Sequence, residues 1–94
     1  MKAVFIRIHS GFANIPDSVV ILPPDQDRFP TDATTDVYSC DLPDGFEFSE
    51  DATGGTKLYY HKNEVWADVQ DKGKTTHIYL YDETSQRVIY KTIV

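Results

Sequence analysis

The sequence predicts an all-β protein, either a small antiparallel barrel or a sandwich, with a C-terminal four-strand meander. Six tyrosines, five phenylalanines and one tryptophan favour strands. Short apolar segments alternate with polar residues and are separated by turn-forming residues. No segment keeps a 3.6-residue periodicity over three turns, so no helix is predicted. At 94 residues the chain is expected to form one domain, residues 1–94.

The N-terminal half predicts four strands, at residues 2–9, 17–22, 37–42 and 46–50. Residues 23–36 contain three prolines and four aspartates and are predicted to form a long, mostly extended loop. The run Pro43-Asp44-Gly45 predicts a turn, because proline fixes φ and glycine accepts a positive φ. Residues 51–55 predict a further turn.

The C-terminal half predicts strands at residues 56–61, 64–70, 75–82 and 87–94. Tight turns are expected at 62–63, 71–74 and 83–86. They place Tyr60 opposite Val65, Ala67 opposite Ile78, and Leu80 opposite Ile89. The predicted core face carries Leu58, Tyr60, Val65, Ala67, Val69, Ile78, Leu80, Ile89 and Ile93. The opposite, aromatic face carries Tyr59, His61, Trp66, Asp68, His77, Tyr79, Tyr81, Val88, Tyr90 and Val94.

This second face has two interpretations. It is either the other half of the core, covered by the N-terminal strands, or an exposed surface for a partner. Tyrosine and tryptophan are enriched at protein interfaces, because they are large and rigid and end in a polar group. A slip of one residue in any turn would move a strand's side chains to the opposite face.

The charge of the chain is uneven. The net charge is −6, but ten acids and one base, Arg28, lie between residues 17 and 51. A one-sided acidic field attracts basic partners and argues against direct binding to nucleic-acid phosphates.

The rest of the composition indicates a cytoplasmic protein. The longest apolar runs have four residues, too short to cross a membrane. The single cysteine, Cys40, allows no intramolecular disulfide, which fits a reducing compartment.

The stretch "DLPDGFEFSED", residues 41–51, is the nearest approach to a motif. As a calcium loop with Gly45 at its sixth position it would need oxygen ligands at Cys40 and Leu42, which supply none. It is therefore interpreted as a turn followed by an amphipathic strand.

No catalytic or metal-binding pattern stands out elsewhere. The three histidines, His9, His61 and His77, lack the spacing of metal ligands, and His77 is expected opposite Asp68. Spacing does not support Cys40 or Ser49 as a nucleophile. Carboxylate pairs of the glycosidase type are available only through the sheer number of acids. We therefore expect no cofactor, no metal and no enzyme activity.

The sequence predicts a protein that works by binding another protein. The leading hypothesis is an inhibitor that presents carboxylates, in place of phosphates, to a basic partner that handles nucleic acid. In size and charge alone the chain is similar to small phage-encoded anti-defence proteins, including anti-restriction and anti-CRISPR proteins. The predicted partner-binding residues are Asp25, Asp27, Asp32, Asp41, Asp44, Glu47, Glu50, Asp51, Tyr59, Trp66, Tyr79 and Tyr81. The alternatives are a structural or adaptor subunit that uses the aromatic face and, third, a sugar-binding or hydrolytic module.

The fold prediction can be checked by far-UV circular dichroism. We expect a strand-dominated spectrum with negligible helix. A helix content above about a quarter, close to that of average soluble domains, would contradict an all-β fold.

Overall fold

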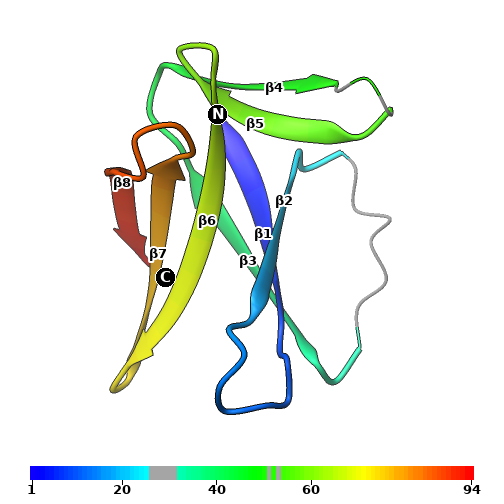
Figure 1. Cartoon of the computed structure of the whole chain (residues 1–94), viewed down its shortest axis with the longest axis vertical. Coiled ribbons are helices and arrows are strands. Elements are labelled where there is room, and N and C mark those ends of the chain that lie inside the picture. Colours follow the sequence, from blue (N-terminus) through cyan, green and yellow to red (C-terminus); the bar gives the residue numbers. More distant parts are fainter. Residues whose placement is uncertain (26–31, 51, 53) are drawn as a thin grey trace.

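The computed structural model describes residues 1–25, 32–50, 52 and 54–94 and contains two antiparallel β-sheets (Figure 1). The smaller sheet has the strand order β2-β1-β3, and the larger has the order β4-β5-β6-β7-β8. The strands are β1 (Lys2–Ile8), β2 (Ser18–Leu22), β3 (Thr35–Asp41), β4 (Phe46–Glu50), β5 (Thr56–Tyr60), β6 (Asn63–Lys72), β7 (Thr75–Asp82) and β8 (Val88–Ile93). The predicted all-β fold and the C-terminal meander are confirmed, and the two sheets do not close into a barrel.

The described residues contain no helix, and hence none long and apolar enough to cross a membrane. The predicted loop at 23–36 is shorter than expected, because β3 begins at Thr35. Residues 26–31 of that loop, and residues 51 and 53 of the predicted turn at 51–55, lie outside the described residues.

One apolar core is shared by the two sheets. Its largest fully buried side chains are Phe5 from β1, Leu58 from β5, and Ile78 and Leu80 from β7. Strand β1 also presents apolar residues on its opposite face. There Ile6 is only 3% exposed and lies between its strand partners Val20 and Val37. This face is only partly withdrawn from water, since Val37 is 53% exposed.

The turns of the meander differ slightly from the prediction. Strands β5 and β6 are joined at His61 and Lys62, whose φ angles of 47° and 71° are those a tight hairpin turn requires. As a result Tyr60 lies opposite Asn63, so the predicted Tyr60–Val65 pairing is wrong by two residues. An even shift leaves every side chain on its predicted face.

The pairing of β6 with β7 differs in the same way. Ile78 lies opposite Val69, and Leu80 lies opposite Ala67, again two residues from the prediction. His77 therefore lies opposite Gln70, and the expected His77–Asp68 pairing is wrong.

A β-bulge changes the faces in β8. Tyr81 pairs with Val88 but Leu80 pairs with Tyr90, so Ile89 is an extra residue in the strand. Beyond the bulge the side chains exchange faces. Tyr90 packs against the core, with its ring 6.1 Å from that of Phe46, whereas Ile93 is 57% exposed. The predictions that Ile93 belongs to the core and Tyr90 to the outer face are wrong for this reason.

A polar cluster ties the two sheets together. Arg7 on β1 donates from Nε to Asp17 Oδ2 at 2.8 Å and from Nη1 to Asp71 Oδ2, on β6, at 2.9 Å. His9 lies between two carboxylates, with Nδ1 3.1 Å from Asp17 and Nε2 2.6 Å from Asp36. The cluster therefore holds three of the acids in contact with the guanidinium of Arg7 and the ring of His9.

These contacts shift the ionisation of the partners. Partial burial disfavours the charged guanidinium, but the hydrogen bonds to Asp17 and Asp71 outweigh this effect and raise the pKa of Arg7. The pKa of Asp17 is lowered by the backbone N–H of Ser10 and by Arg7. The pKa of Asp71 is lowered by hydrogen bonds from Arg7 and from the hydroxyl of Thr76.

Replacing Arg7 with leucine should lower the free energy of unfolding at pH 7 by about 1 to 3 kcal/mol, because Asp17 and Asp71 lose their counter-charge. Urea denaturation measures this loss. In the wild type both carboxyls have a depressed folded-state pKa, so the unfolded state binds more protons in acid. The wild-type protein therefore loses this stabilisation as the pH falls below about 4, and the Arg7→Leu variant should lose less there.

Lys2→Leu is the matched control. It removes an exposed ion pair with Asp41, at 3.4 Å, and should cost less than about 0.5 kcal/mol. If Arg7→Leu costs no more than Lys2→Leu, the cluster does not hold the sheets together.

Candidate functional site

Four predicted partner-binding acids lie on one continuous stretch of chain, which we call the acidic end. Asp41 is the last residue of β3, Asp44 lies in the following turn, and Glu47 and Glu50 lie on β4. All four are exposed. Strands β4 and β5 run together across the top of the molecule in Figure 1.

Gly45 sets the geometry of the turn before β4. Its φ is 105°, and a Cβ atom there would lie 2.7 Å from Tyr60 Cε1 and 3.0 Å from His61 Nε2. Only glycine combines this conformation with so close an approach. The carbonyl of Gly45 accepts a hydrogen bond from the N–H of His61 at 3.2 Å. The turn that carries Asp44 is therefore held against the β5–β6 turn.

The acidic end includes one of the predicted aromatic contacts. Glu47 lies directly opposite Tyr59 on β5. Together with Ser49 and Lys62 these two residues line a shallow hollow of about 200 Å³. Tyr59 therefore belongs to this surface, and on its other side it lies opposite Glu64, two residues before Trp66 on β6.

The remaining acids of the predicted site are placed differently. Asp32 caps the turn before β3, since its carboxylate accepts hydrogen bonds from the N–H and the hydroxyl of Thr34, which lower its pKa. Asp25 is exposed after β2. Asp27 and Asp51 lie outside the described residues.

The acidic third of the chain is therefore not one uniform field. Asp17 and Asp36 are held by Arg7 and His9 in the polar cluster. At the acidic end, Asp41 has only a loose exposed contact with Lys2. Within the described part of the chain, Asp44, Glu47 and Glu50 form no ion pair. Three carboxylates that form no ion pair with a described residue therefore lie within residues 44–50.

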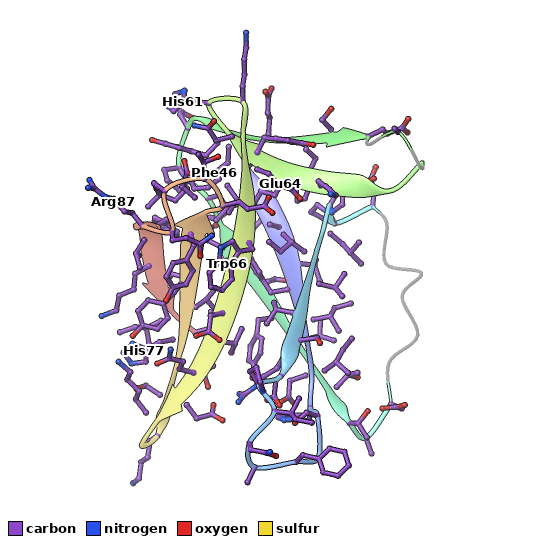
Figure 2. The ribbon with its side chains drawn as sticks, in the orientation of Figure 1. Phe46, His61, Glu64, Trp66, His77 and Arg87 are labelled. Atoms are coloured by element: carbon purple, nitrogen blue, oxygen red, sulfur yellow. The ribbon has the colours of Figure 1, made fainter. Side chains whose placement is uncertain are left out.

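The other aromatic residues of the predicted site lie on the outer side of β6 and β7, away from the shared core. Trp66 and Tyr81 stack with ring centres 4.2 Å apart and planes 9° apart, and Trp66 is 38% exposed. Tyr79 lies two residues along β7 from Tyr81, on the same face. Figure 2 shows Trp66 on β6 and His77 on β7. From here on, the aromatic face means the surface formed by Trp66, Tyr79 and Tyr81.

Lysines border the aromatic face. The ammonium groups of Lys72 and Lys91 lie 5.3 Å and 5.6 Å from the centre of the Tyr79 ring. Neither lysine is among the partner-binding residues predicted from the sequence, which are acids and aromatic residues. In the observed register Lys91 lies opposite Tyr79, and Lys72 lies opposite Thr75 on the same strand as Tyr79.

A second feature missed from sequence is a pair of carboxylates, Glu64 on β6 and Glu83 after β7. A hydrogen bond between their side chains, together with the charge of Glu64, raises the pKa of Glu83. Lys57 lies 2.9 Å from Glu64. Sequence spacing gave no signal, because the two acids are joined only through the β6–β7 pairing.

A groove of about 410 Å³ lies between β2 and the diverging strands β5 and β6. Its walls include Val19, Ile21, Leu58 and Ala67, with Trp66 at one side. Its parts come from residues 19–21 and 56–67, so no local pattern in the sequence could reveal it.

The candidate chemical groups are dispersed. Cys40 is buried, and this burial, followed by the charge of Asp41, raises the pKa of its thiol. His61 packs edge-on against Tyr60. Burial and the charges of Lys91 and Lys72 lower the pKa of His77, whose buried Nδ1 has no hydrogen-bond partner. Among the residues described, no three histidine, cysteine or acidic side chains are grouped to hold a metal ion.

Comparison with known proteins gave no relative: no family model, no curated protein and no solved structure matches the chain.

The environment of Cys40 gives a chemical prediction. Its thiol should react with iodoacetamide at least about tenfold more slowly in the folded protein than in urea, because burial disfavours the thiolate. Mass spectrometry of quenched samples measures the two rates.

The Cys40→Ala and His77→Ala variants should keep their biological activity. A folded variant of either kind with no activity would instead support a catalytic role.

Proposed function

We propose that the protein is a non-enzymatic binding protein whose acidic end docks on a basic surface of another protein, one that handles nucleic acid. The observation that carries the proposal is that, in the described part of the chain, some acids contact basic side chains within the fold and others do not. Asp17, Asp36 and Asp71 contact Arg7 or His9 within the fold, whereas Asp44, Glu47 and Glu50 are exposed and without an ion pair among the described residues.

Exposed carboxylates of this kind act mainly on association. Their field attracts lysine and arginine side chains before contact, which raises the association rate more than the final affinity. Tyr59, which lies opposite Glu47, adds a rigid side chain of the type that contributes most at interfaces.

The partner in this proposal is a protein whose basic surface binds nucleic acid. A surface that binds nucleic acid carries clustered lysine and arginine, so an acidic protein can occupy it as a phosphate mimic. Inhibition of a restriction or CRISPR nuclease in the host cytoplasm, as by small phage-encoded proteins, is one such role.

The test is a pull-down from the native cell at about 50 mM salt, followed by elution in rising salt and mass spectrometry. We expect basic nucleic-acid-handling proteins in the bound fraction, released as screening increases. The triple variant Asp44→Lys, Glu47→Lys, Glu50→Lys should fold normally and lose these proteins, because it reverses the local field.

Asp68→Lys and Glu47→Lys are matched single variants. Each makes the same change in net charge, but Asp68 lies on β6, in the row of Trp66, and Glu47 lies at the acidic end. Glu47→Lys should reduce the association rate of a captured partner several-fold more than Asp68→Lys. If the triple variant holds the same proteins at low salt, the acidic end is not the docking surface.

A second candidate function is supported by the exposed Trp66–Tyr81 stack. In this alternative the protein is a structural or adaptor subunit that buries the aromatic face in a larger assembly, and binding resists salt. Trp66 is the only tryptophan, so its fluorescence reports on that face alone. If a captured partner shields Trp66 from acrylamide quenching and the triple variant still binds, the adaptor function is correct.

A further inference from the structure

The strands at the edges of the two sheets are β2, β3, β4 and β8. Exposed edges invite pairing with another chain, and charged side chains commonly prevent it. Strand β3 carries Asp36 and Asp41, and β4 carries Glu47 and Glu50. Strand β2 lies against β6 and β5. Strand β8 carries one charged side chain, Lys91, and no carboxylate, and no strand lies beyond it in the described sheet.

The backbone of β8 has a free side. Thr76 accepts a hydrogen bond from the N–H of Val94 at 2.9 Å, which fixes the alternation of the β7–β8 ladder. In an antiparallel ladder every second residue bonds to the neighbouring strand and the others point away. Tyr90, Thr92 and Val94 therefore bond to β7. Lys91 and Ile93 turn their N–H and C=O groups outward.

The side chains near this edge are apolar or basic. Val88, Ile93 and Val94 are 49%, 57% and 44% exposed. Residues 84–94 contain Arg87 and Lys91 but no acid, although the net charge of the chain is −6. The edge therefore combines free backbone groups, exposed apolar side chains and a local positive charge.

We propose that β8 binds an extended segment of a partner protein as an added sixth strand of the larger sheet. The segment carries a carboxylate opposite Lys91 and an apolar residue opposite Ile93, two positions along the same face. Backbone hydrogen bonds supply the affinity in this mode of recognition, and alternate side chains supply the specificity. This inference uses a different surface from the acidic end and does not depend on the proposed function.

Charge distinguishes this partner from a second copy of the chain. If two β8 edges paired, Lys91 would lie opposite Ile89, Lys91 or Ile93 of the second copy, depending on register. None of these supplies a counter-charge, and a lysine directly opposite a lysine is destabilising. An acidic extended segment gives hydrogen-bond partners to the outward backbone groups of β8 and a counter-charge to Lys91.

The test uses two synthetic peptides with blocked ends, Thr-Val-Thr-Glu-Thr-Val-Thr and the same sequence with lysine in place of glutamate. Each is titrated into the 15N-labelled protein and followed by NMR. The glutamate peptide should shift the amide signals of residues 88–94 and protect the N–H groups of Lys91 and Ile93 from exchange. The lysine peptide should bind at least about fivefold more weakly.

Three variants test the separate parts of the mechanism. Lys91→Glu should reverse the preference between the two peptides. Ile93→Pro removes an outward N–H that β7 does not use, so it should abolish binding of both peptides. Ile93→Thr is its matched control, because it keeps the N–H and should weaken binding only partly.

The proposal is overturned if neither peptide shifts residues 88–94, or if Lys91→Glu leaves the preference unchanged. It is also overturned if the amides of Lys91 and Ile93 become protected with rising protein concentration alone, which would identify a second copy as the occupant. Should Ile93→Pro fail to fold, the charge reversal at Lys91 still decides the outcome.

Discussion

The structure depends on the apolar contact between the two sheets. Phe5 of the smaller sheet and Leu58, Ile78 and Leu80 of the larger sheet are withdrawn from water almost completely. A chain of this size buries only about 60% of the surface exposed by its unfolded form. It therefore forms one core, with few apolar side chains left to cover a second face. The outer side of β6 and β7 is left to solvent as a result. That is why Trp66, which stacks on Tyr81, is 38% exposed.

The polar cluster around Arg7 has a consequence for function as well as for stability. It joins β1 to β6 across the gap between the sheets, and in doing so it uses Asp17, Asp36 and Asp71 as structural groups. The chain is strongly acidic by composition, and Asp44, Glu47 and Glu50, at the β4 end of the larger sheet, are exposed and form no ion pair among the described residues.

The larger sheet has opposite chemical character at its two edges. Strand β4 carries Glu47 and Glu50, whereas β8 carries Lys91 and exposed apolar side chains. The aromatic face lies between these edges. The proposed docking of a basic protein at β4 and the proposed binding of an extended segment at β8 therefore use opposite edges of one sheet.

Sequence alone determined the fold class, the places of the meander turns to within one or two residues, and the core face of β5, β6 and β7. Alternation of side chains along a strand is a local property, and two-residue errors in pairing do not change it. The tertiary structure decided the strand pairing and the contacts between residues distant in the sequence. The bulge at Ile89 exchanged the faces of Tyr90 and Ile93. The contacts of Arg7 and His9 with Asp71 and Asp36 were decided there too, because they join residues distant in the sequence.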